Sequence, residues 1–329
     1  MLEEKLKILL IGGTGFLGYY ATKELLACGH QINVLSLPPE PPPGLFPEEV
    51  EIHLADMSSL SDEHLQSLLR GNDAVVFAAG VDDRVTPRKP AYPFFSKHNV
   101  ESVRRVFTLA RAAGVRRGIV LGSYFAYFDR IWPEMNLTIH HPYIRSRVEQ
   151  AGAAIDAGGN DMIVSVLELP YIFGSMPGKI PLWKPLISYV ASPFPLVYPT
   201  GGTACVSVTQ VAQAIRGAVE HGEQGKCYPI GGTNLTWIQL LEEISRLAGK
   251  PKRVITLPTW LVKVGAWCLK AVHDIKGLES GLEPVAFIDL QIRNTFIDPH
   301  ISQSALHYSN EDLTQALTDT MNACVEPGG

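Results

Sequence analysis

Apolar residues in the first half of the chain gather in short, nearly continuous runs. Between the runs, apolar and polar positions alternate with a helical period. Such runs predict strands buried on both faces, and the helical period predicts helices that cover them. The predicted strands span residues 6–10, 31–35, 50–54, 73–79, 117–122 and 162–169. The predicted helices span residues 61–70, 93–113 and 143–157, and a first helix carries Leu17, Ala21 and Leu25 on one face.

This alternation of strands and helices predicts an α/β fold, a doubly wound parallel sheet of the Rossmann type. Right-handed crossovers place helices on both faces of such a sheet, and ligands bind outside the carboxyl ends of its strands. We therefore expect the functional residues of this half of the chain where strands end.

The pattern changes after residue 170, where prolines interrupt short apolar segments. Helices are predicted at residues 209–220 and 236–247, each beginning with a threonine that can cap it. A further helix follows Pro258, and we expect Trp260, Trp267 and Leu261 of this helix in the core. The predicted organisation is a dinucleotide-binding domain over residues 1–170 and a smaller, irregular substrate domain over residues 171–329. Some segments of the second domain are expected to return to the first.

Composition excludes several other classes of protein. The chain has 329 residues, of which 46% are hydrophobic and 19% charged, as in ordinary globular enzymes. A net charge of −5 provides no basic field for nucleic acid, and no apolar run is long enough to predict a membrane span. The five scattered cysteines form no paired motif, and the start of the chain does not resemble a signal peptide. We expect a cytoplasmic protein with reduced thiols. No metal site is predicted, because the His140–His141 pair has no third ligand at a suitable spacing.

A glycine-rich segment follows the first strand directly. Gly12 allows a tight turn, Gly15 lets the backbone approach a diphosphate, and Gly18 lets the next helix pack against the strand. The N–H groups at the start of that helix then face the anion. Glycine turns are common in α/β proteins, but the strand before this one and the amphipathic helix after it favour a dinucleotide site.

Three polar residues near the fifth strand form a candidate catalytic group. Ser123 ends that strand, and Pro142 begins a helix that carries Tyr143 and Arg147 four residues apart on one face. A nearby cation lowers the pKa of a phenol, which suits proton transfer to or from an alcohol, while the serine can orient the substrate oxygen. Alternatively, Tyr143 is an ordinary half-buried tyrosine and Arg147 forms a surface ion pair with Glu149.

Taken together, the motifs resemble those of the extended short-chain dehydrogenase/reductase family, also called the NAD-dependent epimerase/dehydratase family. The resemblance spans nearly the whole chain. The matching residues are Gly12, Gly15, Gly18, Asp56, Ala78, Ala79, Gly80, Asn99, Ser123, Pro142, Tyr143, Ser146, residues 169–174, Trp260, Leu261 and residues 296–298. The resemblance implies that Asp56 contacts the adenine, that Ala78–Gly80 line the cofactor, and that Tyr143 is the catalytic acid/base assisted by Ser123.

The sequence departs from the family pattern at three positions. Arg147 replaces the lysine of Tyr-x-x-x-Lys, and keeps the charge with a different donor geometry. The second strand ends in Ser36 without the acid that holds an NAD ribose or the arginine typical of NADP enzymes, so the choice between NAD and NADP stays open. Glu168 stands where many relatives carry arginine.

These observations define the predicted site. The predicted catalytic residues are Ser123, Tyr143 and Arg147. The residues predicted to bind NAD or NADP are Gly12, Thr14, Gly15, Phe16, Leu17, Gly18, Ser36, Asp56, Met57, Ala78, Ala79, Gly80, Tyr143, Arg147, Pro170 and Ile172.

The sequence favours an NAD(P)-dependent oxidoreductase acting on a small carbonyl or secondary alcohol. One alternative is a nucleotide-sugar epimerase or dehydratase, although Lys179, Lys184 and Arg253 do not cluster as a diphosphate site requires. Another is a catalytically weak NAD(P)-binding sensor. The predicted partners are a small-molecule substrate and a second copy of the chain, with no nucleic acid and no membrane. The two long helices, at residues 93–113 and 143–157, could form the dimer contact, or their apolar residues could simply cover the sheet.

Overall fold

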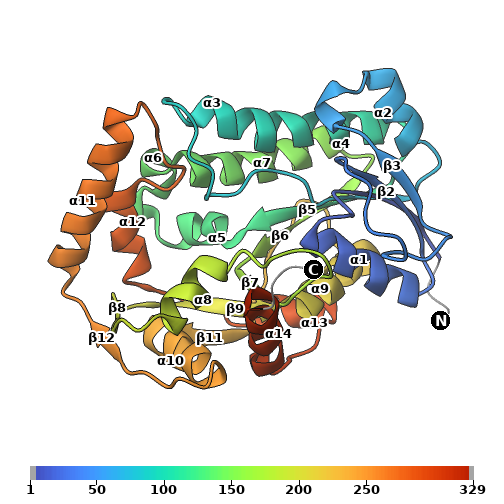
Figure 1. The fold of residues 1–329 in the computed structure, drawn as a ribbon. Helices are drawn as coiled ribbons and strands as arrows, with labels where there is room; N and C mark the ends of the chain where they lie inside the picture. The colour runs from blue at the N-terminus through green and yellow to red at the C-terminus, as the bar shows by residue number, and fades with distance from the viewer. Residues whose placement is uncertain (1–4, 326–329) are drawn as a thin grey trace.

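The computed structural model describes residues 5–325, and its centre is a parallel sheet of seven strands (Figure 1). The strand order is β10-β6-β5-β4-β1-β2-β3, so the winding direction reverses between β1 and β4. This confirms the predicted doubly wound Rossmann fold. The strands are β1 (Lys7–Ile11), β2 (Gln31–Ser36), β3 (Glu51–Leu54), β4 (Ala74–Phe77), β5 (Arg117–Ser123), β6 (Ile163–Leu169) and β10 (Cys227–Pro229).

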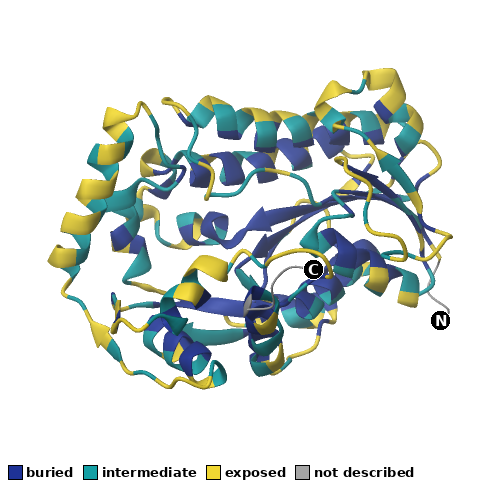
Figure 2. Cartoon of the chain, viewed as in Figure 1, coloured by how far each residue is buried: buried dark blue, intermediate teal, exposed yellow. Residues whose placement is uncertain are grey.

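Helices cover both faces of this sheet. One face packs against α2 (Asp62–Leu69), α4 (Ser102–Ala112) and α7 (Pro142–Gly158), and the other against α1 (Phe16–Ala27), α9 (Val208–His221) and α13 (His300–Leu306). The central strands β1, β4, β5 and β6 are largely buried between the two layers (Figure 2), whereas the edge strand β3 has no buried residue. The apolar residues considered for a dimer contact cover the sheet within this chain: Val103, Val106, Phe107 and Ala110 are all fully buried.

The helix predicted over residues 93–113 is three consecutive segments. They are α3 (Tyr92–Phe95), the π-helical turn η2 (Ser96–Glu101) and α4. The π turn contains Asn99, which is fully buried. A hydrophobic period does not reveal such a turn, because it widens the helix locally without changing which residues are apolar.

The rest of the chain forms a second layer of smaller elements. Its sheet contains β7 (Tyr171–Phe173), β9 (Gly202–Ser207), β11 (Thr233–Thr236) and β13 (Asn294–Thr295), and β8 (Leu196–Tyr198) pairs with β12 (Val254–Thr256). Its helices are α8 (Lys184–Ala191), α10 (Trp237–Leu247), α11 (Thr259–Ile275), α12 (Pro284–Gln291) and α14 (Leu313–Val325). The short elements η1 (Met57–Ser59), α5 (Tyr124–Ile131), η3 (Pro133–Met135) and α6 (Leu137–His140) complete the fold. Strand β10 and helices α9 and α13 follow residue 170 in the sequence but pack with the seven-stranded sheet.

Two expectations for this second half are wrong. Helix α9 is capped by Ser207, whose hydroxyl accepts from Gln210 N, and not by Thr209; Thr236 caps α10 as predicted. Helix α11 does not belong to the core. Trp260 and Trp267 are 68% and 64% exposed, because α11 lies at the edge of the molecule and packs mainly on α12 (Figures 1 and 2).

Within residues 5–325, the structure contains no helix with the length and apolar character that a membrane span requires.

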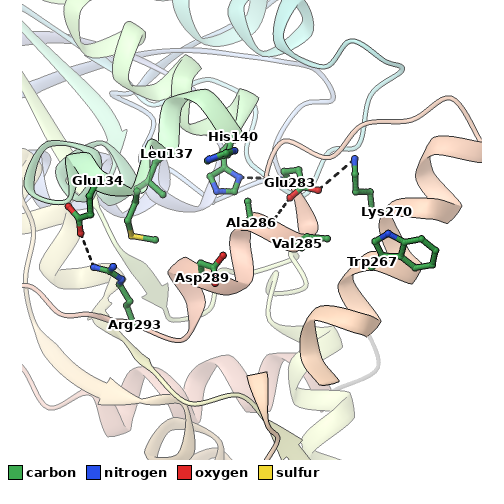
Figure 3. A pocket seen from close by; sticks show the side chains of 12 residues that line it. Glu134, Leu137, His140, Trp267, Lys270, Glu283, Val285, Ala286, Asp289 and Arg293 are labelled. Atoms are coloured by element: carbon green, nitrogen blue, oxygen red, sulfur yellow. Dashed lines mark hydrogen bonds and ion pairs between the residues drawn. The ribbon is translucent and has the colours of Figure 1, made fainter. Parts of the chain in front are cut away.

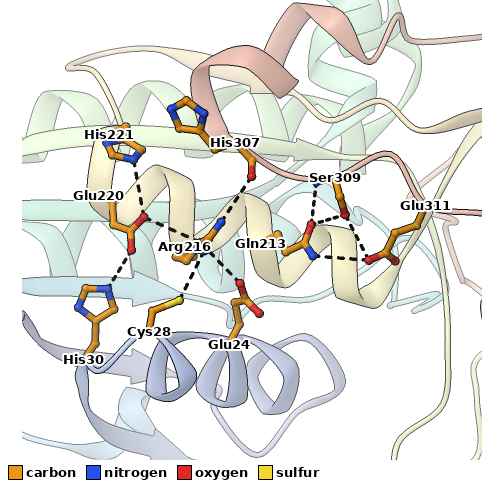
Figure 4. Close-up of polar contacts among 10 residues, drawn as sticks. All are labelled: Glu24, Cys28, His30, Gln213, Arg216, Glu220, His221, His307, Ser309 and Glu311. Carbon is orange, nitrogen blue, oxygen red and sulfur yellow. Dashed lines mark hydrogen bonds and ion pairs between the residues drawn. The ribbon is translucent and has the colours of Figure 1, made fainter. Parts of the chain in front are cut away.

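Hydrogen bonds and ion pairs connect α1 and the residues after it to α9 (Figure 4). His30 accepts a hydrogen bond from Leu6 N through Nδ1, so its other nitrogen, Nε2, carries the proton and faces Glu220 Oε1 at 3.2 Å. Arg216 Nε lies 3.5 Å from Glu24 Oε1 and 3.9 Å from Glu220 Oε2. Because α1 begins at the glycine-rich loop, these contacts also help to hold that loop.

Glu168 has a structural partner. Its carboxylate is fully buried on β6 and accepts two hydrogen bonds, at 2.6 and 2.7 Å, from Arg130 of α5. Burial raises the pKa of Glu168, and the Arg130 guanidinium opposes that rise. The pair ties α5, which begins at Ser123, to the neighbouring strand.

We predict that Arg130→Met will lower the free energy of unfolding by about 2–4 kcal/mol. The estimate lies toward the lower end for buried pairs because Arg130 is itself half exposed. Without Arg130 the folded-state pKa of Glu168 rises further above its unfolded value. The loss of stability should therefore be largest while the buried carboxyl of Glu168 is ionised. It should shrink as the pH falls from the raised folded-state pKa of Glu168 toward its unfolded-state pKa, because the carboxyl then becomes neutral in the folded variant. Urea denaturation at several pH values measures it. Arg246→Met, which removes an exposed ion pair with Glu243, is the control and should leave the free energy of unfolding close to the wild-type value.

Candidate active site

The glycine-rich loop between β1 and α1 has room for backbone only. A Cβ on Gly18 would lie 2.3 Å from Gly12 O, and one on Gly12 would lie 2.8 Å from Ala78 O, at a φ of +88°. Gly15 precedes α1 without a side-chain cap, and the first turn of the helix carries no acidic residue. The start of α1, with Phe16 and Leu17, therefore presents uncapped N–H groups that suit a diphosphate.

The predicted adenosine-binding residues lie at the ends of β2 and β3. Ser36 is 4% exposed, and its hydroxyl oxygen accepts from Thr14 N at 3.0 Å. Asp56 is exposed, and its Oδ1 accepts from both the backbone N and the hydroxyl of Ser58 at 2.8 Å, which lowers the pKa of the carboxyl. One carboxylate oxygen of Asp56 is thus committed to capping η1, and half-buried Met57 follows it.

Ser123, Tyr143 and Arg147 come together at the carboxyl end of β5. Ser123 is the last residue of that strand and the N-cap of α5, while Tyr143 is the second residue of α7 and is 5% exposed. Arg147 Cζ lies 5.8 Å from the centroid of the Tyr143 ring, and Arg147 Nη2 donates to Leu121 O at 2.7 Å. The helical spacing and the strand end together bring these residues to one place.

One hydrogen-bond donor of Arg147 is buried and unpaired in the described part of the chain. Its side chain is buried, its Nε has no hydrogen-bond partner in the described part of the chain, and a Cβ on Gly80 would lie 3.5 Å from its Nη1. The suggested ion pair with Glu149 is not formed, because Glu149 accepts from Arg145 Nε at 2.9 Å. A buried donor beside a side-chain-free backbone fits the ribose of a dinucleotide.

Burial has the largest effect on Tyr143. It raises the pKa of the phenol, and the Arg147 charge together with a hydrogen bond involving Ser123 only partly opposes that rise. Arg147 thus lowers this pKa as expected, but the net shift is upward because burial has the larger effect. Desolvation inside the aromatic cluster is the reason: the Phe95 and Phe125 ring centroids lie 5.7 and 6.3 Å from that of Tyr143.

Two acidic residues beside Tyr143 were not predicted from the sequence. Asp82 and Asp83 follow Gly80 after β4, and both raise the pKa of Tyr143. The pKa of Asp83 is itself raised by burial and by Asp82, while Asp82 pairs with Arg84. Their place directly after the Ala78–Gly80 motif, at the end of a parallel strand, is the signal that could have identified them.

Asn99 holds this acidic loop against α7. Its side chain accepts from Val81 N at 2.9 Å and donates to Val81 O at 3.1 Å and to Ser146 Oγ at 3.1 Å. Ser146 in turn donates to Tyr143 O at 2.7 Å. The loop that carries Asp83 and the helix that carries Tyr143 are thus joined through one buried amide.

The remaining predicted residues lie where β6 ends and β7 begins. Leu169 pairs in register with Ser123, so buried Pro170 follows directly beside that serine. Ile172 lies in β7, and its carbonyl accepts from Trp183 Nε1 at 2.7 Å. Aromatic side chains lie beyond them: the ring centroids of Tyr124 and Tyr171 are 6.0 Å apart.

A separate cavity of about 660 Å³ lies at the start of α7 (Figure 3). It is lined by residues of α6, α11 and α12, among them Trp267, Lys270 and Glu283. Burial lowers the pKa of His141 to about 4, so this cavity-lining imidazole is neutral, and its Nδ1 accepts from Glu283 N at 3.0 Å. The contact fixes the segment before α12 to the residue that precedes Pro142.

Comparison with known proteins identifies the domain. Residues 12–168 match the family model described as NAD(P)H-binding. A Synechocystis protein provisionally named dihydroflavonol 4-reductase is 22% identical over 327 residues, which covers 94% of this chain and 92% of that protein. Residues 12–168 are therefore an NAD(P)H-binding domain.

Two solved enzyme structures superpose on nearly the whole chain. A nucleoside-diphosphate-sugar epimerase from Pseudomonas aeruginosa has a TM-score of 0.73 at 19% identity over 97% of each chain. A dTDP-glucose 4,6-dehydratase from Streptomyces venezuelae, a double mutant solved with NAD, has a TM-score of 0.68 at 18% identity over 96% of each chain. The chain thus shares the fold of these two enzymes, which is the fold that the motif resemblance implied.

We predict that Gly15→Ala will weaken NAD(P)H binding by roughly tenfold or more, or about 1.4 kcal/mol. The new Cβ would lie 3.1 Å from Gly12 O and would occupy space that the diphosphate needs. Cofactor fluorescence titration measures the change. Gly152→Ala, on an open face of α7, is the matched control and should leave the dissociation constant unaltered. Equal affinities for the two variants would contradict the placement of the diphosphate at this loop.

Proposed function

We propose that this protein is an NAD(P)-dependent oxidoreductase that acts on a small carbonyl or secondary alcohol through Ser123, Tyr143 and Arg147. The observation that carries the proposal is the position of the Ser123–Tyr143–Arg147 group. It lies at the carboxyl edge of the sheet beside an NAD(P)H-binding loop. Chemistry at that edge is the usual arrangement in doubly wound folds.

Each of the three residues has a distinct role. When bound, the nicotinamide accepts a hydride from the alcohol or donates one to the carbonyl. Ser123 orients the substrate oxygen by a hydrogen bond. Tyr143 Oη gives its proton to that oxygen in the reductive direction and takes it back in the oxidative direction. Arg147 binds the ribose through its unpaired Nε and keeps a positive charge near the phenol.

The substrate side favours an apolar molecule over a nucleotide sugar. Tyr124, Phe125 and Tyr171 form an aromatic cluster next to Tyr143, and Asp83 adds an acidic group beside that tyrosine. The dihydroflavonol 4-reductase name of the Synechocystis relative agrees with an aromatic carbonyl substrate. Reduction of such a carbonyl therefore has the strongest support.

A nucleotide-sugar epimerase or dehydratase is the second candidate, and the observation in its favour is the shared fold with enzymes of those names. A catalytically weak NAD(P)-binding sensor, which binds the cofactor without turnover, is the third, because burial raises the pKa of Tyr143. A screen of aromatic ketones and nucleotide-diphosphate sugars, monitored by nicotinamide absorbance, separates the three.

We predict that Tyr143→Phe will lower kcat by about 10²–10⁴-fold, the usual contribution of a positioned acid/base group. Cofactor binding should be retained, because the ring stays in its aromatic cluster. Steady-state kinetics and a cofactor titration on the same preparation make the test. Tyr189→Phe, which removes a phenol hydroxyl bonded to Val197 away from this site, is the matched control and should leave kcat near the wild-type value. Unchanged turnover in Tyr143→Phe would disprove the assigned proton transfer.

We predict that Asp83→Asn will shift the pH profile of turnover toward lower pH. Removing the negative charge lowers the pKa of Tyr143, so the reductive rate, which needs the protonated phenol, declines at a lower pH. The oxidative rate, which needs the phenolate, rises at a lower pH for the same reason. Asp161→Asn, at an exposed position before β6, should leave the profile in place. A shift in the opposite direction would contradict the electrostatic role of Asp83.

A further inference from the structure

Lys179 lies against the glycine-rich loop although it is far away in the sequence. Its Nζ donates to Thr14 O at 2.8 Å. The segment that carries Lys179 is held to the first turns of α1, because Tyr20 Oη donates to Ser175 O at 2.8 Å and a Cβ on Gly174 would lie 3.3 Å from the Phe16 ring. The ammonium group is therefore fixed to the nucleotide-binding loop by its own bond and by its neighbours.

Thr14 also connects this lysine to the end of β2. The Thr14 N–H donates to Ser36 Oγ, and the Thr14 carbonyl accepts from Lys179, so one residue bridges the two side chains. In dinucleotide-binding sheets the end of the second strand faces the adenosine ribose. Lys179 thus lies at the ribose end of the site rather than at the nicotinamide end.

The end of β2 itself carries no acidic side chain. Strand β2 ends in Ser36, followed by exposed Leu37 and Pro38, so the carboxylate that would bind a free 2′-hydroxyl and repel a 2′-phosphate is not present at these positions. An ammonium and a hydroxyl are suitable donors for a phosphate monoester, and charge-assisted bonds of this kind are the strong ones.

We propose that Lys179 and Ser36 form a 2′-phosphate site and that the protein binds NADP in preference to NAD. The inference rests on dinucleotide binding at the glycine-rich loop, and it is independent of the catalytic roles given to Ser123, Tyr143 and Arg147. It assigns to a lysine from the second half of the chain the function that an arginine after β2 has in other NADP enzymes.

The test uses two probes that differ only in the group of interest, 2′,5′-ADP and 5′-AMP, titrated calorimetrically into the full chain. We expect 2′,5′-ADP to bind roughly tenfold or more tightly than 5′-AMP, as a hydrogen bond to a charged group implies. Lys179→Met should abolish the difference by weakening only 2′,5′-ADP, and Lys179→Arg should retain it. Lys184→Met is the matched control and should behave as the wild type, since Lys184 begins α8 and its charge acts on Cys324 instead.

Other outcomes would overturn the inference. Equal affinity of the wild type for the two probes, or an equal loss of both in Lys179→Met, would place the ammonium at the 5′-phosphate or away from the ligand. NADP⁺ and NAD⁺ titrated in the same way must follow the same order. If none of the four ligands binds, the dinucleotide site itself fails, which is distinguishable from a wrong choice between NAD and NADP.

Discussion

The close approach of α1 to β1 is the constraint on which the rest of the site depends. A side chain at Gly18 would overlap the Gly12 carbonyl, so the helix can lie against the strand only because no Cβ is present. That contact places the start of α1 at the carboxyl ends of β1 and β4, the paired strands between which the winding direction reverses. The polar network between α1 and α9 and the bonds of Thr14 and Tyr20 then hold the helix in this orientation.

Buried charge is arranged around this edge with partners on neighbouring elements. Glu168 is satisfied by Arg130, and the pair fixes α5 next to the strand that Ser123 ends. Among the described residues, Arg147 Nε has no hydrogen-bond partner, and the charge of Asp83 raises the pKa of Tyr124, Tyr143 and Tyr171. The fully paired charges stabilise the scaffold, while the incompletely paired ones lie where cofactor and substrate would bind. This division is typical of functional sites.

Residues of the second half of the chain contribute to the site by hydrogen bonds to residues of the first half. Gly281 O accepts from Tyr143 N, and Lys179 Nζ donates to Thr14 O in the glycine-rich loop. The two halves are therefore joined at the cofactor edge, although the exposed helix α11 shows that not every apolar segment of the second half is used for packing. A surface helix of this kind obeys the same hydrophobic period as a core helix.

Local patterns in the sequence determined the nucleotide-binding fold, the glycine turn and the convergence of Ser123, Tyr143 and Arg147. Continuous apolar runs, strand ends and helical spacing are sufficient for these. Only the tertiary structure decided the partner of Glu168, the acidic pair beside Tyr143, the burial that raises the pKa of that phenol, the exposure of Trp260 and Trp267, and the place of Lys179. Each of these depends on residues that are distant in the sequence or on how far water is excluded. A periodicity carries no information about either, because it describes one element and not what packs against it.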